Sequence, residues 1–445
     1  MELINEFFIF LILLLIFSAL YIGGYIKLKR DFLFLVFIGQ SLIYNHIMPT
    51  KYVYENLSLT IQIQTYITLQ YFVLIFYEIP LILIYFFRIR NKKINTSISF
   101  MVSQKNSFLY NSFILFCLIF SFGFLYISIT NFVFFTRIGH RALFELTQNL
   151  STIEFLIYRI YKELGLFISV LLLILKISSG HRNFFNLLNI SFVSNVLIYG
   201  AFVLVNNRLQ SIIFILILSF TYIIFTNIKI KFKVLGFVLI AVFYSITVVT
   251  NFRDSFSENN GKPKFSQVIN PFYESNEYND PLSNRLNGLY YIASAFDKID
   301  TKGYALFKPI NHSFKMLLGS FYSSEYYLNA KSNLLTNSRS ITGVHFFGFA
   351  SVDTYQTHLS ELFLSFGIIG FFLGSIIMAN LFVYVTTNIF EPKSIFKLLL
   401  AILMTYYILQ FEKDFISILL GWVKLIPLLI ILSLFLNLKH VSKNV

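Results

Sequence analysis

The chain has 445 residues, of which 57% are hydrophobic and only 13% are charged. Soluble domains carry about a quarter charged residues, so this composition excludes an ordinary soluble protein and indicates an integral membrane protein. The formal net charge of +14 would suit a nucleic-acid partner. The basic residues instead stand in short clusters at the ends of apolar runs, as topology signals do, and nucleic-acid binding is not expected.

Apolar runs long enough to cross a bilayer core of about 30 Å recur along the chain. We therefore expect an all-α polytopic membrane protein with about eleven transmembrane helices. The predicted spans lie near residues 5–26, 32–48, 66–87, 108–135, 156–176, 187–205, 209–227, 234–250, 361–389, 396–411 and 415–437. The fifth span carries the charged run RIYKEL at its outer end. The alternative is therefore that the neighbourhood of Arg137 to Lys162 lies along the membrane interface and does not cross the membrane.

Basic clusters predict the orientation of these spans. In the eleven-span arrangement they all fall on one side, which the positive-inside rule makes cytoplasmic. The clusters are KLKR from Lys27, RIRNKK from Arg88, GHR ending at Arg182, KIKFK from Lys229, EPKSIFK ending at Lys397, and the tail KHVSK. The N-terminus is then outside and the C-terminus cytoplasmic, in a multi-pass membrane protein.

One long outer loop divides the predicted bundle. We expect a bundle of about eight helices over 1–250, a loop subdomain over 251–360 and about three helices over 361–445. The loop is rich in Tyr, Phe and Asn, and its charges nearly balance. Loops of this length are usually functional or disordered, and the aromatics here favour an ordered subdomain. The stretch KIDTKGYALFKPINHSFKMLL fits short amphipathic helices.

Nucleotide and metal chemistry leave no trace in the sequence. It contains no P-loop, no G-x-G-x-x-G, no H-E-x-x-H and no D-x-D placed for a nucleotide-sugar metal ion. The single cysteine, Cys117, excludes an intrachain disulfide and a thiolate metal cluster. The cytoplasmic loops are short, so we expect chemistry on the outer side, with lipid-linked donors and without a cofactor or metal.

Arginines near the outer surface are candidate phosphate-binding residues. The guanidinium group binds phosphate through two parallel hydrogen bonds and keeps its charge. The candidates are Arg208 in VNNRLQS, Arg253 in TNFRDS, Arg285 in PLSNRLNGLYY and Arg339 in TNSRSITG. Interfacial arginines also snorkel or bind ordinary lipid phosphate, and that alternative applies to each one singly. Arg208 is the best placed, because it stands in a very short turn between two spans.

A polar stretch before the ninth span holds the candidate catalytic residues. The run SVDTYQTHLSELFLSFGIIG places Asp353, His358 and Glu361 close together. In a helix, His358 and Glu361 are three positions apart and share a face, which suits an acid–base pair at the membrane edge. The alternative is that Glu361 caps the helix or pairs with an arginine. Gly367, Gly370 and Gly374 are interpreted as close-packing positions.

Other polar residues are assigned weaker roles. His46, Glu78 and Gln410 lie singly within apolar runs and are interpreted as packing hydrogen bonds. The loop aromatics Tyr290 and Tyr291, with Phe346 and Phe347, are candidates for stacking on sugar rings; the alternative is that they form the core of the loop itself.

The run ELFLSFGIIG resembles the element that follows the long outer loop in oligosaccharide repeat-unit polymerases, the Wzy-type O-antigen and capsule polymerases. Their pattern is roughly E-L-Y-x-N-F-G-x-x-G. The residues that match it are Glu361, Leu362, Phe363, Phe366, Gly367 and Gly370, with Ser365 where Asn is usual. The resemblance implies a multispan, lipid-donor (GT-C-like) glycosyltransferase of the bacterial inner membrane that moves a growing glycan from undecaprenyl pyrophosphate onto a lipid-linked repeat unit. It also implies membrane lipid and a chain-length regulator protein as partners.

Two alternatives remain open at this point. O-antigen ligases have a related layout with a His-Asn pair in the outer loop, but His358 is followed by Leu359. A transporter or flippase of lipid-linked oligosaccharide is the other class; the long outer loop and the absence of two similar halves argue against it.

Overall fold

A computed structural model shows how the chain folds. It describes residues 2–50, 60–92, 94, 100–104, 107–131, 150–179, 186–206, 208–226, 264–270, 288–322, 324–326, 329, 338–348, 357–409, 422, 425–427, 429–430, 433–434 and 436–440. These residues belong to two compact units. Unit 1 comprises Met1–Thr96, Asp280–Phe390 and Leu403–Pro427, and unit 2 comprises Ser97–Asn279, Glu391–Ile402 and Leu428–Val445. The three-part division expected from the sequence remains a prediction.

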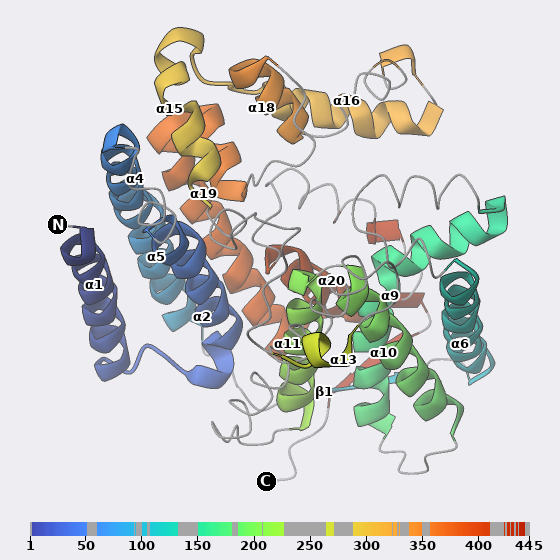
Figure 1. The fold of residues 1–445 in the computed structure, drawn as a ribbon. Helices are drawn as coiled ribbons and strands as arrows, with labels where there is room; N and C mark the ends of the chain where they lie inside the picture. Colours follow the sequence, from blue (N-terminus) through green and yellow to red (C-terminus); the bar gives the residue numbers. More distant parts are fainter. Residues whose placement is uncertain are drawn as a thin grey trace. The chain divides into compact units, whose positions relative to one another are not determined.

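Unit 1 is built around long apolar helices (Figure 1). They are α1 (Glu2–Ile22), α2 (Leu28–Leu42), α4 (Thr60–Val73), α5 (Ile79–Arg90) and α19 (His358–Phe390). Two short π-helices, η1 (Ile43–Ile47) and η2 (Leu74–Glu78), prolong α2 and join α4 to α5. Helix α19 packs along η2 and α5 and also contacts α2. The core of the unit is therefore apolar packing between α19 and the first helices of the chain.

A proline follows each π-helix at the same distance. Pro49 stands two residues after the end of η1, and Pro80 two residues after the end of η2. Proline lacks an N–H, and its ring presses on the carbonyl four residues earlier, so the preceding turn widens. A π-helical turn is one way to take up that strain, and such turns are frequent at functional sites.

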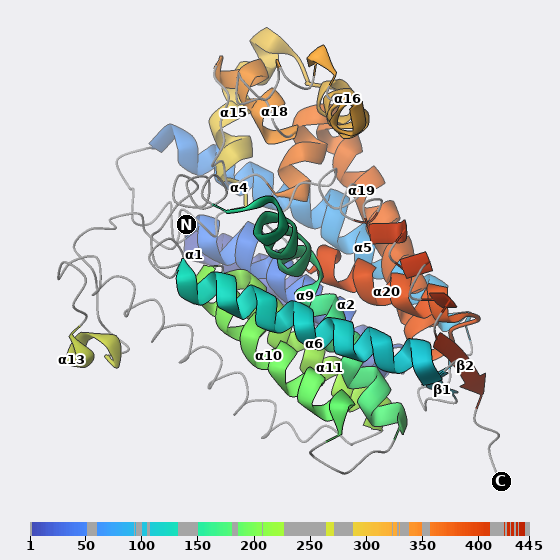
Figure 2. The same ribbon diagram turned by 90° about the vertical axis from the view of Figure 1, so that its right-hand side faces the viewer.

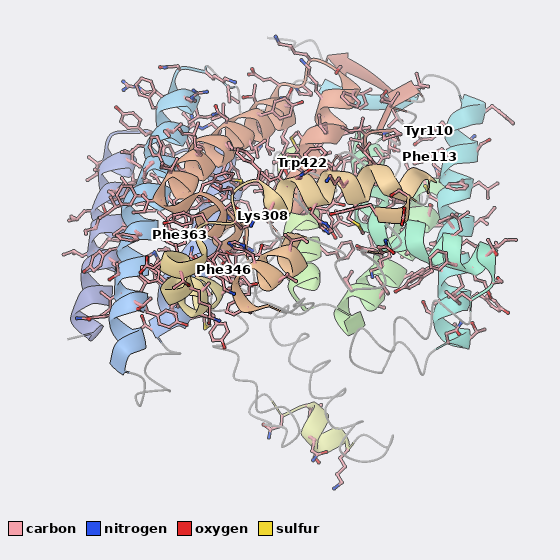
Figure 3. All side chains as sticks on the ribbon, turned by 90° about the horizontal axis from the view of Figure 1, so that it is seen from above. Tyr110, Phe113, Lys308, Phe346, Phe363 and Trp422 are labelled. Carbon is pink, nitrogen blue, oxygen red and sulfur yellow. The ribbon has the colours of Figure 1, made fainter. Side chains whose placement is uncertain are left out.

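Part of the predicted outer loop forms three helices of unit 1. They are α15 (Tyr290–Lys302), α16 (Lys308–Tyr322) and α18 (Ser338–Phe347). The amphipathic stretch identified in the sequence corresponds to the end of α15, the whole turn after it and most of α16. Helix α15 contacts α4, α18 and α19, and α16 packs on α18. Figure 3 looks down on these helices and labels Lys308 of α16 and Phe346 of α18.

Unit 2 contains four helices packed side by side (Figure 2). They are α6 (Ser107–Thr130), α9 (Thr152–Ser179), α10 (Leu187–Asn206) and α11 (Arg208–Thr226). Aromatic rings fill the core, and Phe124 lies 4.6 Å from Tyr161, centroid to centroid. The ring of Tyr199 packs against Gly165, and a Cβ atom on Gly165 would lie only 2.0 Å from that ring. The charged start of α9 is one continuous helix with its apolar end.

The remaining elements are short or divided. Helix α13 (Phe265–Val268) lies in unit 2, and the units divide α20 (Ile395–Ile408) after Ile402. Strands β1 (Phe100–Gln104) and β2 (Leu436–His440) pair antiparallel, with Phe100 opposite His440 and Gln104 opposite Leu436. The sequence did not predict strands, and the last predicted span was extended to residue 437, where β2 has already begun.

The described chain is all-helical apart from this strand pair, and it contains 4 helices long and apolar enough to cross a membrane. They are Lys29–Thr50, Gln64–Arg90, Tyr110–Thr130 and His358–Phe390. Shorter apolar helices are Leu11–Ile22, Leu164–Ser179, Leu187–Val203, Ile213–Thr226 and Ile395–Ile408. Each coincides with a predicted span. The predicted span 234–250 and most of the span 415–437 lie outside the described residues. Gln410 lies outside them as well.

Candidate functional site at the head of α19

The first turn of α19 is capped by its own sequence. Thr357 precedes the helix, and its hydroxyl accepts a hydrogen bond from the backbone N–H of Ser360 at 3.2 Å. The carbonyl of Thr357 accepts the N–H of Glu361 at 3.1 Å. This is an N-cap, which fixes the direction of the side chains that follow. His358, Ser360 and Glu361 all enter the protein from this turn and are buried.

His358 and Glu361 therefore share one helical turn, as their spacing predicted. His358 is 1% exposed and Glu361 3% exposed. The Nε2 atom of His358 lies 2.9 Å from the hydroxyl of Tyr77, the residue before Glu78 in η2. The ring of Phe37 lies 5.8 Å from the imidazole. The candidate acid and base are thus held inside unit 1 and do not lie on its surface.

Gly288, two residues before α15, connects that helix to the first turn of α19. Its N–H donates to the carbonyl of Tyr44 in η1 at 2.8 Å. Its carbonyl accepts the hydroxyl of Ser360 at 3.0 Å. A Cβ atom at this position would lie 2.9 Å from Oδ1 of Asn45, so the close approach requires glycine. Gly288 belongs to the RLNGLYY segment that the sequence singled out, and it joins three elements at one point.

Helix α19 is broken at Gly367, which has φ 64° and ψ −146°. A Cβ atom on Gly370 would lie 2.1 Å from the carbonyl oxygen of Leu362, and one on Gly374 2.5 Å from the Leu362 side chain. The first segment therefore turns back onto the second. The glycines allow close packing, as expected, but the partner is the same helix. The predicted span 361–389 lies within α19, which is long and apolar enough to cross a membrane, and the positive φ at Gly367 adds a break that the sequence did not predict.

The segment between α15 and α16 covers this break. The N–H groups of Ala305 and Leu306 donate to the carbonyls of Leu364 at 2.9 Å and Ser365 at 3.1 Å. They satisfy carbonyls left free at the end of the first segment. The ring of Tyr304 fills the space where a Cβ atom on Gly367 would lie, at 2.8 Å from its hydroxyl oxygen. The segment after α15 therefore closes the site from this direction.

A second polar cluster lies in the two π-helices. Nε2 of His46 lies 2.8 Å from one carboxylate oxygen of Glu78, and the two side chains are 2% and 0% exposed. The other carboxylate oxygen accepts the hydroxyl of Ser41 at 2.6 Å. The amide of Asn45 donates to that same hydroxyl at 3.0 Å. Among the described residues, Nδ1 of His46 has no hydrogen-bond partner.

Side chains bind the backbone carbonyl of His46. It accepts the hydroxyl of Thr50 and the amide of Gln70, each at 3.1 Å. His46 and Glu78, interpreted from the sequence as separate packing groups, form one buried hydrogen-bonded pair. No local pattern in the sequence joins them, since the residues stand 32 positions apart.

The other predicted site residues are placed as follows. Arg208 is the first residue of α11 in unit 2, two residues after the end of α10, and Arg339 lies in the first turn of α18. The side chains of both, and the whole of Arg253, Arg285 and Asp353, lie outside the described residues.

The candidate sugar-stacking aromatics lie in α15 and α18. Tyr291 is 3% and Phe346 0% exposed, and Tyr291 packs edge-on against Phe347 at 5.4 Å. In this conformation Tyr291 and Phe346 are core residues of the loop. Tyr290, at the start of α15, is half-buried.

Groups that can accept or donate a proton gather at the head of α19. The carboxylate of Glu361 and the imidazole of His358 lie in one turn of α19, and the phenol of Tyr77 in η2 contacts the imidazole. Buried groups of this kind interact strongly in a low-dielectric setting and suit acid–base chemistry. Among the described residues, no group of three or more His, Cys, Asp or Glu side chains could hold a metal ion.

Comparison with known proteins does not assign the chain to a family. No protein-family model, no curated protein and no solved structure matches it.

Proposed function

We propose that this chain is a polytopic membrane glycosyltransferase that polymerises a surface polysaccharide such as O-antigen. It would transfer a growing glycan from undecaprenyl pyrophosphate to a lipid-linked repeat unit on the outer face of the bacterial inner membrane. The observation that carries the proposal is the buried turn His358–Glu361 at the head of α19, linked to Tyr77 and covered by the α15 segment. An outer-side reaction with a lipid-linked donor needs its catalytic groups at the end of a membrane helix, and His358 and Glu361 stand in the first turn of such a helix.

The reaction assigns a role to each group. A hydroxyl oxygen of the acceptor sugar attacks the anomeric carbon of the donor, and the bond from that carbon to the diphosphate oxygen breaks. The acceptor proton passes to Glu361 or His358, and undecaprenyl pyrophosphate leaves with the electron pair. A positioned base accelerates such a step by about 10²–10⁴-fold. Asp353 is the third candidate for this role.

The arginines would bind the donor. Arg208, Arg253, Arg285 and Arg339 supply guanidinium groups for a diphosphate, which a bidentate fork recognises better than an ammonium does. Tyr290 is the aromatic candidate for contact with a sugar ring, since it keeps part of its ring exposed.

The strand pair fits the number of predicted spans. β1 follows the basic cluster after α5, and β2 ends in Lys439 and His440, the first two residues of the tail KHVSK. Because the strands are hydrogen-bonded, these two segments lie on one side of any membrane. An even number of spans between them satisfies this condition, as the predicted topology requires, with the N-terminus outside and the C-terminus cytoplasmic.

Turnover of the purified protein with synthetic lipid-linked repeats tests the proposal. Glu361→Gln keeps the size of the side chain and removes its basicity, so polymer formation should fall by at least about a hundredfold. Leu359→Met, in the same turn, is the matched control and should keep turnover. Full turnover of Glu361→Gln across pH 6 to 8, at equal folded amount, would assign Glu361 to anchoring the helix.

A transporter of lipid-linked oligosaccharide is a second candidate, favoured by the His46–Glu78 pair. Ionisable pairs inside membrane helices mark proton or ion pathways in many transporters. Deletion strains separate the two functions. Loss of a polymerase leaves single exported repeats, whereas loss of a transporter leaves no exported glycan.

A further inference from the structure

Helix α16 carries an exposed apolar stripe. Phe307, Phe314 and Leu318 are 66%, 52% and 58% exposed. With Asn311 they occupy positions separated by four, three and four residues, which form one face of a helix. Asn311 donates its N–H to the carbonyl of Phe307 at 2.9 Å, so Phe307 belongs to the same helical turn.

The opposite face of α16 is already covered. His312 and Ser313 are 4% and 3% exposed, and the helix packs on α18 along this side. Nδ1 of His312 lies 2.6 Å from the hydroxyl of Tyr326. The exposed stripe is therefore a second apolar face on a helix whose core-facing side is satisfied, and it needs an occupant of its own.

The charge on α16 points to the occupant. The sequence KPINHSFKMLLGSFY contains Lys308 and Lys315 and no acidic residue. Both lysines are exposed. Nζ of Lys315 lies 5.3 Å from the centre of the Tyr326 ring, and Nζ of Lys308 lies 3.3 Å from Nδ1 of His345. An apolar face flanked by lysines complements a membrane surface, with hydrocarbon below and anionic headgroups above.

The place of α16 in unit 1 agrees with this charge pattern. Figure 1 shows α16 lying crosswise at the head of α19, and Figure 2, turned by 90°, shows α16 nearly end-on. The ring of Phe307 contacts Phe366 of α19 at 5.2 Å. Soon after, α19 exposes Ile369, Phe372 and Leu373 at 69%, 46% and 46%. The stripe thus begins where the exposed apolar surface of a membrane-length helix ends.

We infer that α16 is an interfacial anchor, which lies in the plane of the membrane with Phe307, Phe314 and Leu318 in the acyl region and Lys308 and Lys315 at anionic headgroups. Such helices bury their apolar face about 5–10 Å into the headgroup–acyl boundary. The inference needs α19 to cross a bilayer but does not depend on the proposed glycosyltransferase. It gives the outer helices a fixed height above the membrane, and with them the segment that covers Glu361.

Fluorescence depth measurement on the full chain tests this anchor. The protein has one tryptophan, so Trp422→Phe gives a silent background and Phe314→Trp a single reporter. The purified protein is placed in vesicles of phosphatidylcholine with phosphatidylglycerol, containing lipids brominated at shallow or deep acyl positions. Ser294, an exposed residue of α15, is changed to Trp as the matched control. We expect bromine quenching at 314 to exceed that at 294 by about twofold or more, with the shallow bromines most effective.

Two outcomes would overturn the inference. Quenching at 314 no greater than at 294 means that the stripe does not reach the acyl region. Blue-shifted emission at 314 without bromine quenching means that protein covers the stripe, as in a second copy or another partner. A nitroxide at Leu318→Cys, in a Cys117→Ala background, repeats the test at a second position. There, oxygen should relax the label more than a water-soluble nickel complex does, and the reverse order would also reject the anchor.

Discussion

Removal of the Glu78 carboxylate should destabilise unit 1 strongly. Glu78 is 0% exposed, shares a hydrogen bond with His46 and accepts one from Ser41. The amide that Glu78→Gln introduces cannot satisfy both partners with the same geometry. Each buried polar partner that is left unsatisfied costs about 1–3 kcal/mol. We therefore expect Glu78→Gln to lower the free energy of unfolding of unit 1 by about 2–6 kcal/mol.

Thiol labelling during heating can report each unit separately. Native Cys117 is buried in unit 2 and reacts only when that unit opens. Ala379, fully buried in α19, becomes the reporter for unit 1 in an Ala379→Cys, Cys117→Ala protein. For a unit of this size, 1 kcal/mol corresponds to about 2–4 °C in the midpoint of unfolding. Glu78→Gln should thus lower the midpoint at residue 379 by on the order of 10 °C.

Two further variants check the cause. Glu325 is exposed, and Glu325→Gln should change the midpoint by less than about 2 °C. The double variant His46→Leu, Glu78→Leu removes both members of the pair and should be more stable than Glu78→Leu alone, because only the Ser41 hydroxyl, and no longer His46, is then left without its partner. A midpoint for Glu78→Gln within 2–4 °C of the wild type, about 1 kcal/mol, would refute a paired, desolvated carboxylate at this position.

Three other predictions follow from single contacts. Gly370→Ala should prevent normal folding, since its Cβ would lie 2.1 Å from the backbone oxygen of Leu362, whereas Gly123→Ala, 3.6 Å from the Ile157 side chain, should not; monodisperse yield on size exclusion compares them, and equal yields would contradict the fold-back of α19. Tyr77→Phe removes the hydroxyl beside Nε2 of His358 and should change the pH profile of turnover while unit 1 stays folded; an unchanged profile would exclude a positioning role for Tyr77. Hydrogen bonds from the hydroxyl and backbone N–H of Ser151, at 2.7 and 2.9 Å, hold the pKa of Glu154 below its ordinary value. The contribution of the carboxylate is therefore present above the unfolded pKa and is lost as pH falls through the folded one, whereas the hydrogen bond from the Glu154 N–H to the Ser151 hydroxyl, at 3.4 Å, remains. The difference in hydrogen-exchange protection between wild type and Ser151→Ala at the start of α9 should therefore be larger at pH 7 than near pH 3, and a difference of equal size at both pH values would contradict the role of the carboxylate.

The sequence predicts the helices well because membrane helices depend on a local property. A run of apolar residues of sufficient length must satisfy its backbone internally, and a helix does so without distant partners. Helices α6 and α10 accordingly lie where the apolar runs predicted them. The first turn of α19 follows the same rule, since Thr357 as a cap and the spacing of His358 and Glu361 are local signals.

The contacts between distant residues could not be read in this way. His46 and Glu78 look like separate polar residues in two apolar runs, and only the folded chain brings η1 and η2 close enough for the two side chains to form a hydrogen bond. The strand pair joins Phe100 to His440, and no local pattern favours one partner over another. Gly370 was recognised as a close-packing position, but the identity of its partner depended on the positive φ of Gly367.

The two π-helices hold neighbouring polar groups of unit 1. Asn45 and His46 stand in η1 and Tyr77 and Glu78 in η2, and His46 contacts Glu78. The same turns present Tyr77 to His358 and the carbonyl of Tyr44 to Gly288. A change in either π-helix would therefore reach the head of α19 through these two hydrogen bonds, so the His46–Glu78 pair and the candidate acid–base turn depend on the same two π-helical turns.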